Sequence, residues 1–123
     1  MLAAALVLAC TDADAPSAKV TPISADALLA MPPSHVLILD VRTREEYASG
    51  HVPGAINIPH TEVEKRLAEL GTDPTLPVVV YCERGVRAGK AESQLLAAGF
   101  SELRHLEGDM RAWRENDRPT ERP

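Results

Sequence analysis

The feature that most constrains the fold is the stretch formed by residues 78–88, where an apolar run stops abruptly at a cysteine. Three consecutive valines and Tyr81 precede Cys82, which is the composition of a buried strand. After a short polar loop, a helical pattern runs from residue 88 to residue 98. A strand that leads through a tight loop into a helix favours an α/β domain.

The loop after this strand predicts an anion site that contains a reactive cysteine. Free N–H groups of the loop and of the helix N-terminus point inward, and the helix dipole favours negative charge there. The same field stabilises a thiolate, so Cys82 is a candidate nucleophile that faces an anionic substrate. A cysteine at a strand end can also be a small buried hydrophobe. Gly85 and Arg87, at their offsets from Cys82, favour the nucleophile.

The rest of the chain alternates between strand and helix patterns with short connections. Further strands are predicted at residues 20–23, 36–39, 55–58 and 100–106. Helices are predicted at residues 25–31, 61–70 and 88–98, after the capping box at Thr43, and after Gly108. This alternation indicates a mostly parallel sheet, whose ligands lie beyond the carboxyl ends of the strands. Two such strand ends have charged or nucleophilic side chains, namely residues 40–42 and residues 82–87.

Composition excludes several classes of function. A length of 123 residues indicates one domain, and a net charge of −5 without a run of Lys or Arg argues against nucleic-acid binding. The two cysteines, Cys10 and Cys82, are far apart, so a framework disulfide is not expected. The four histidines are scattered, so no metal site is predicted.

Residues 1–19 are predicted to lie outside the domain. Residues 2–9 are apolar and have the length of a signal-peptide core, although no basic residue precedes Lys19. Residues 7–10 resemble a bacterial lipoprotein cleavage box, which predicts a membrane tether through lipidated Cys10 and a location in the cell envelope or periplasm. The alternatives are an unstructured apolar N-terminus and a cytoplasmic location. Residues 11–18 read as a polar linker, residues 20–119 as the domain, and residues 120–123 as the end of a frayed polar tail that begins at Asn116.

Taken together, three segments of the chain resemble single-domain rhodaneses of the sulfurtransferase superfamily. They are residues 40–59, which begin DVRTREEY and continue to GHVPGAINIP, residues 81–88, YCERGVRA, and residues 106–109, LEGD, with Trp113 just after. The resemblance implies a three-layer α/β fold, with a five-stranded mostly parallel sheet and helices on both faces. One departure is Asp109, because a second glycine is usual at this position in the family.

The resemblance also implies an activity. The family's cysteine takes the outer sulfur of a donor such as thiosulfate, releases sulfite, and holds the sulfur as a persulfide until cyanide or a thiol removes it. By this match, Cys82 carries the sulfur and no further cofactor is required. The loop that would wrap the persulfide with backbone N–H groups consists of Glu83, Arg84, Gly85, Val86 and Arg87.

The roles of Arg84 and Arg87 stay open at this point. Arg84 either draws in the anionic donor or is a solvated side chain. Arg87 either binds the donor's oxygens or holds loop carbonyls. Asp40 and Arg42 are interpreted as a supporting ion pair at the base of the site.

Three other functions compete with sulfur transfer. A cysteine phosphatase uses a similar strand, loop and helix, but its loop has one residue more than the four that separate Cys82 from Arg87. A non-catalytic rhodanese-like module could bind a partner or carry sulfur for it. A thiol redox protein would need a Cys-x-x-Cys pair, which the sequence lacks.

Overall fold

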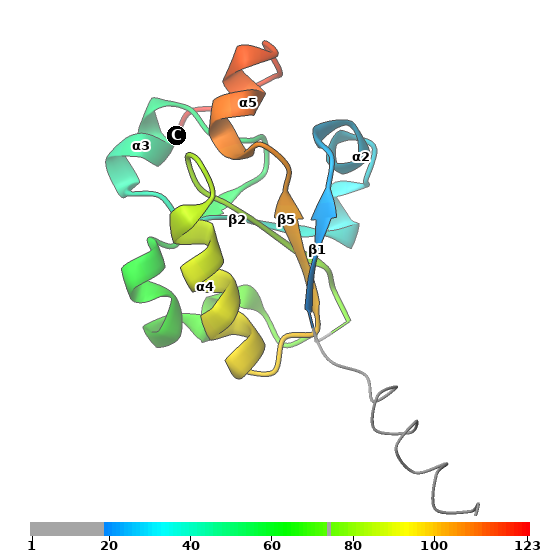
Figure 1. The fold of residues 1–123 in the computed structure, drawn as a ribbon, viewed down its shortest axis with the longest axis vertical. Helices are drawn as coiled ribbons and strands as arrows, with labels where there is room; N and C mark the ends of the chain where they lie inside the picture. The colour runs from blue at the N-terminus through cyan, green and yellow to red at the C-terminus, as the bar shows by residue number, and fades with distance from the viewer. Residues whose placement is uncertain (1–18, 74) are drawn as a thin grey trace, which may run out of the picture.

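A computed structural model describes residues 19–73 and 75–123 of the chain. Five strands form one parallel sheet in the order β1-β5-β4-β2-β3. The strands are β1 (Lys19–Ile23), β2 (Leu37–Asp40), β3 (Ile56–Asn57), β4 (Val78–Tyr81) and β5 (Glu102–Leu106). The parallel sheet predicted from the alternating pattern is therefore confirmed, and β4 is its central strand (Figure 1).

Helical segments connect the strands. They are α2 (Ala25–Leu29), η1 (Pro33–His35), α3 (Arg44–Ser49), η2 (His60–Lys65), η3 (Leu67–Leu70), α4 (Val86–Ala97) and α5 (Asp109–Glu115). The predicted capping box forms, because Thr43 and Glu46 bond each other's backbone N–H groups at the start of α3. None of the helices in the described ranges has the length and apolar character that crossing a membrane requires.

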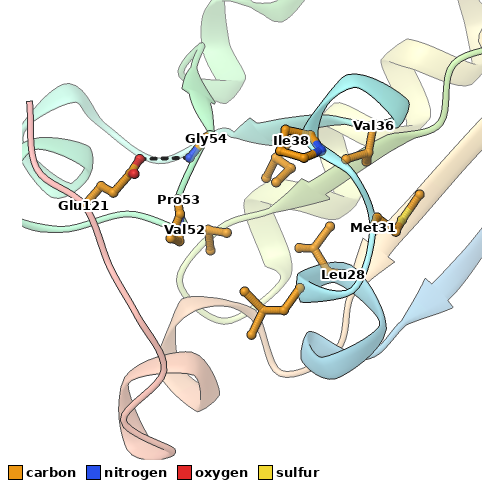
Figure 2. A pocket seen from close by; sticks show the side chains of 10 residues that line it. Leu28, Met31, Val36, Ile38, Val52, Pro53, Gly54 and Glu121 are labelled. Atoms are coloured by element: carbon orange, nitrogen blue, oxygen red, sulfur yellow. Dashed lines mark hydrogen bonds between the residues drawn. The ribbon is translucent and has the colours of Figure 1, made fainter.

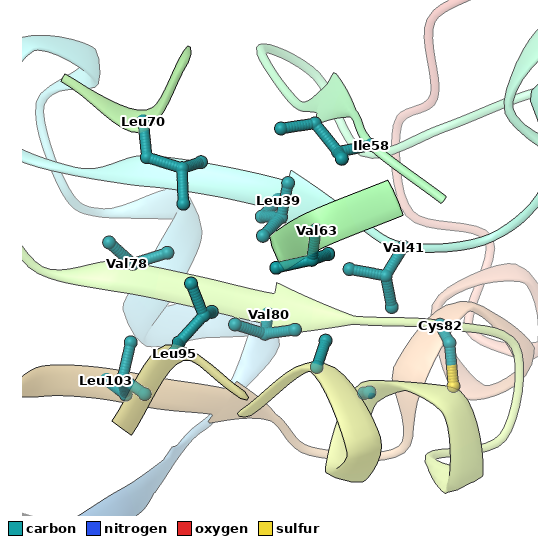
Figure 3. Packing of buried hydrophobic residues seen from close by; sticks show 12 residues of the cluster. Leu39, Val41, Ile58, Val63, Leu70, Val78, Val80, Cys82, Leu95 and Leu103 are labelled. Carbon is teal, nitrogen blue, oxygen red and sulfur yellow. The ribbon is translucent and has the colours of Figure 1, made fainter. Parts of the chain in front are cut away.

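The sheet separates two apolar layers. On one face, α4, η2 and η3 cover a cluster that includes Leu39, Val80 and Leu95, which are fully buried (Figure 3). On the other face, α2 and α5 cover a second cluster that includes Tyr81 and Trp113. Because β4 is buried on both faces, the chain that leaves its carboxyl end is held firmly in position.

The helix expected at residues 25–31 ends at Leu29, and two other helices differ more from the prediction. The helix expected at residues 61–70 is two 3₁₀ segments, since Arg66 leaves the helical region with φ −121° and ψ 25°. Leu67 and Leu70 are three residues apart, a spacing that 3₁₀ turns place on one side. The helix expected from residue 88 begins at Val86, so the loop between the central strand and this helix comprises Cys82, Glu83, Arg84 and Gly85.

The C-terminal tail, which was expected to fray, is packed against the domain. Glu121 and His51 exchange two backbone hydrogen bonds of 2.9 Å. The Trp113 indole N–H donates to the carbonyl of Pro119 at 2.7 Å. The pairing of His51 with Glu121 joins residues far apart in the chain and leaves no signal in the local sequence. The apolar N-terminus, the polar linker and the lipidation predicted at Cys10 all lie outside the described residues.

Candidate active site

Cys82 lies directly after the carboxyl end of β4 and is 1% exposed. Figure 3 shows its side chain at the end of the strand, with the sulfur on the side of the loop and helix that follow. The N–H of Gly85 donates to this sulfur at 2.9 Å. Gly85 is the N-cap of α4 and has φ +111°. Residues that carry a side chain rarely adopt this backbone conformation, because it is strained for them. The loop therefore turns the backbone N–H of Gly85 onto the sulfur.

A shallow bowl of about 310 Å³ opens above the cysteine. Its lining comprises Cys82, Glu83, Arg84, Val86 and Arg87, which are the loop residues predicted for the site, apart from Gly85. Val86 is 72% exposed, and Arg84 is exposed without an ion pair to any described residue. The bowl thus exposes one free cation and one apolar side chain to solvent, while Cys82 lines it from a nearly buried position.

A second pocket, of about 340 Å³, is lined mainly by apolar side chains such as Leu28, Met31 and Ile38 (Figure 2). Its one ionisable lining residue is Glu121, whose carboxylate accepts a hydrogen bond of 2.9 Å from the N–H of Gly54. Because its lining includes neither a nucleophile nor a cation, the chemistry of this protein is better placed at Cys82.

Arg87 is paired with a residue that was not predicted as its partner. Its guanidinium forms two hydrogen bonds with the carboxylate of Glu46, at 2.6 and 3.0 Å, and so joins the first turn of α4 to α3. This hydrogen bonding raises the pKa of Arg87 and lowers that of Glu46 from 4.5 to about 2. The pair forms between residues 41 positions apart, which is why the sequence alone did not reveal it.

The Arg87–Glu46 pair predicts a specific loss of stability in acid. A carboxyl whose pKa is lower in the folded state contributes stability above its unfolded pKa of about 4.5, and this contribution is lost as the pH falls towards 2. The free energy of unfolding, measured with urea between pH 5 and pH 2, should therefore fall more steeply for the parent than for Glu46→Gln. Glu45→Gln, on the same helix but without such a pair, should follow the parent. Equal slopes for the parent and Glu46→Gln would contradict the prediction.

Asp40 and Arg42 form the ion pair that the sequence predicted at the base of the site. Both side chains are fully buried, and the shortest of their contacts is 2.7 Å. Asp40 also accepts from the Tyr81 hydroxyl at 2.7 Å, and Arg42 donates to the carbonyl of Gly50 at 2.8 Å. The other arm of Arg42 lies 3.5 Å from Glu83. The pair thus ties the ends of two neighbouring strands to the cysteine loop.

The N-terminus of α5 fixes the backbone of the loop from the opposite side. Its first N–H groups, from Met110 and Arg111, donate to the carbonyls of Cys82 and Glu83 at 3.0 and 3.1 Å. The carboxylate of Glu83 pairs with Arg114, whose hydrogen bonds lower the pKa of Glu83. The loop is therefore held at its carbonyls and at its acidic side chain before any substrate binds.

Sequence reasoning did not identify Asp109 as part of the site. Its carboxylate accepts a hydrogen bond of 3.0 Å from the N–H of Cys82. Asp109 has φ +53°, a left-handed conformation that aspartate tolerates better than most residues. The sequence signal that could have identified Asp109 is that it replaces the glycine expected at this position from the resemblance. The last helix begins after Gly108, as predicted.

Comparison with known proteins agrees with this geometry. Residues 22–116 match the family model described as the Rhodanese-like domain. The chain is 40% identical over 70 residues to the thiosulfate sulfurtransferase PspE of Escherichia coli, covering 57% of this chain and 67% of that protein. It is 38% identical over 76 residues to the uncharacterized protein YqhL of Bacillus subtilis, covering 62% of this chain and 59%, less than two thirds, of that one. The crystal structure of the Alr3790 protein from Anabaena is similar, with a TM-score of 0.73, 30% identity and 82% of each chain covered.

Proposed function

Because this chain belongs to the family of rhodanese-like domains, whose members include sulfurtransferases, we propose that it is a thiosulfate-type sulfurtransferase with Cys82 as its sulfur carrier. Its relatives support sulfur transfer in general terms. The observation that carries the finer proposal is the position of the Cys82 sulfur. The sulfur lies just after the carboxyl end of the central strand and accepts a hydrogen bond from the backbone N–H of Gly85. It also borders the bowl that contains the free cation Arg84.

The reaction consists of two displacements at sulfur. In the first, the Cys82 thiolate attacks the outer sulfur of thiosulfate, the sulfur–sulfur bond of the donor breaks, and sulfite leaves with the bonding electron pair. The product is a persulfide on Cys82. In the second, a thiolate or cyanide attacks the outer sulfur of the persulfide, and the Cys82 thiolate is regenerated. Because both displacements are written with anionic nucleophiles, the proposed path assigns no general base.

The loop supports the anionic forms along this path. The N–H of Gly85 points at the sulfur and stabilises negative charge on it. Arg87 cannot neutralise an incoming anion without leaving Glu46, to which it is bound by two hydrogen bonds. Arg84 is the loop cation left free among the described residues, so we assign it to the attraction of the donor.

The test of the proposed function is to load the protein with thiosulfate. Intact-mass measurement should show a gain of one sulfur atom, peptide mapping should place it on Cys82, and sulfite should appear in equal amount. Cyanide should then remove the added mass as thiocyanate. If neither thiosulfate nor another sulfane donor gives a persulfide, the protein is not this enzyme and the reading as a non-catalytic module replaces it. Hydrolysis of an aryl phosphate that is lost in Cys82→Ser would instead establish the phosphatase.

A substitution at Arg84 tests the assignment of the free cation. Arg84→Ala should raise the KM for thiosulfate by about three- to ten-fold, because one exposed charge contributes on the order of 1 kcal/mol to attracting an anion. The kcat should stay within about two-fold, since the reacting sulfur keeps its Gly85 donor. Steady-state kinetics at low ionic strength measure both constants. Arg84→Lys should retain the parent KM, and Lys19→Ala, which removes an exposed cation at the amino end of β1, should leave both constants unchanged. A parent-like KM in Arg84→Ala would refute the assignment.

A further inference from the structure

A cluster of three ionisable side chains lies beneath the cysteine loop and takes no part in the reaction proposed above. Glu92 comes from α4, His105 from β5 and Asp109 from α5. One ring nitrogen of His105 lies 2.5 Å from the Glu92 carboxylate, and the other lies 3.0 Å from that of Asp109. Within the described residues, no group of such side chains has an arrangement that could hold a metal ion. The three side chains therefore form an ionic network.

The geometry of the cluster fixes the charge of the imidazole. Each ring nitrogen faces a carboxylate oxygen, and a carboxylate accepts hydrogen bonds, so both nitrogens must donate. His105 is then an imidazolium, and its hydrogen bonds to Asp109 and Glu92 raise its pKa from 6.5 to about 10. Two carboxylates thus share one cation, and the side chains of both carboxylates are almost fully buried. The cluster carries one net negative charge at neutral pH.

Asp109 connects this cluster directly to Cys82. One of its carboxylate oxygens accepts the N–H of Cys82 at 3.0 Å, while the other accepts from His105. That second oxygen also packs under the loop, because a methyl group added at Gly85 would lie 3.2 Å from it. The residue that donates to the cysteine sulfur, Gly85, therefore rests on Asp109.

We propose that Asp109 is a positioning residue for Cys82, and that His105, oriented by Glu92, supplies the positive charge that lets a carboxylate lie beneath a reactive thiolate. The inference deepens the proposed function and rests on it for its catalytic consequence. Asp109 holds the cysteine backbone so that the Gly85 N–H meets the sulfur. His105 keeps the charge of Asp109 from opposing the thiolate, since like charges that lie close together disfavour each other.

Charge reasoning predicts opposite effects for the two partners of Asp109. His105→Gln leaves two carboxylates without their shared cation, so the thiolate should form at higher pH. Glu92→Gln removes one carboxylate and leaves the imidazolium with Asp109, so the thiolate should form at lower pH. A purely structural role would loosen the loop in both variants and would not give shifts of opposite sign.

The experiment measures thiolate formation directly. Each variant carries Cys10→Ser, so that iodoacetamide reports Cys82 alone, and the alkylation rate is followed from pH 5 to pH 10. The midpoint of this profile should rise by about half a unit or more in His105→Gln and fall by a few tenths in Glu92→Gln. His60→Gln, a histidine exchange outside the cluster, should keep the parent midpoint. Other charged groups lie around the cysteine loop and stay unchanged in all these variants. They are Asp40, Arg42, Glu46, Glu83, Arg84, Arg87 and Arg114.

Asp109 itself is tested by rescue. Asp109→Gly removes the acceptor for the Cys82 N–H while permitting the left-handed backbone, and it should slow persulfide formation with thiosulfate at least about ten-fold. Asp109→Asn keeps an acceptor oxygen at this position and should recover most of the rate. Loading of Asp109→Gly at the parent rate would overturn the positioning role.

The remaining outcomes separate this inference from the proposed function. Midpoints that shift in the same direction, or not at all, in folded His105→Gln and Glu92→Gln would refute the electrostatic role of the cluster. The thermal transition shows whether His105→Gln folds. If it does not fold, the inference is tested by the alkylation midpoint of Glu92→Gln and by the loading rates of the two Asp109 variants. If the parent forms no persulfide but the alkylation midpoints shift as predicted, the cluster tunes Cys82 and it is the proposed function that fails.

Discussion

Replacing Cys82 with serine should abolish persulfide formation while leaving the fold intact. The hydroxyl is smaller than the thiol and can accept the same N–H from Gly85, so the loop keeps its local hydrogen bond. A hydroxyl remains protonated at neutral pH, whereas sulfur transfer requires an anionic nucleophile. Thiosulfate-dependent release of sulfite should therefore fall by at least about 10³-fold, the usual cost of removing a nucleophile. Intact mass after thiosulfate treatment, together with a sulfite assay, measures the loss.

Cys10→Ser is the matched control, because it removes the other cysteine of the chain, which lies outside the described residues. It should load one sulfur atom as the parent does. Sulfur bound to Cys82→Ser but absent from Cys10→Ser would place the carrier at the wrong cysteine and overturn the assignment. An unchanged thermal transition in both variants establishes that the effect is chemical.

The features that were predicted correctly are those whose signal lies within a few consecutive residues. The valine run before Cys82 is the central strand because β-branched side chains pack well on both faces of a sheet. The capping box at Thr43 and Glu46 fixes the start of α3, since its partners are three residues apart. The ion pair between Asp40 and Arg42 was equally visible, because its members are neighbours on one strand end.

The features that were missed depend on contacts between distant segments. Arg87 pairs with Glu46 because the sheet brings the carboxyl ends of β2 and β4 together. The helices that contain these two residues, α4 and α3, begin near those strand ends. Asp109 reaches Cys82 because β5 lies beside β4 and α5 follows it directly. The early start of α4 depends on Gly85, whose positive φ lets the helix begin within the predicted loop. Spacing within one segment carries no information on such pairs.

Removing Arg42 should cost more stability than any other single substitution considered above. Its side chain is 1% exposed and it shares three hydrogen bonds with the side chain of the fully buried Asp40. Arg42→Met would leave that carboxylate without its cation in the interior, where breaking such a pair costs about 3–5 kcal/mol. Domains of this size are stable by roughly 5–15 kcal/mol, so the loss is a large share of the total. Urea unfolding at pH 7, with the midpoint and slope fitted together, measures it.

The exposed pair between Arg66 and Glu69 provides the control, since solvent screens it and Arg66→Met should cost far less than Arg42→Met. A second comparison separates an orphaned charge from lost packing. Combining Arg42→Met with Asp40→Asn removes the uncompensated carboxylate, while the Tyr81 hydroxyl keeps an acceptor at residue 40. The double variant should therefore be more stable than Arg42→Met alone. If it is less stable, the cost arises from packing and from the lost bond to the Gly50 carbonyl rather than from the buried charge.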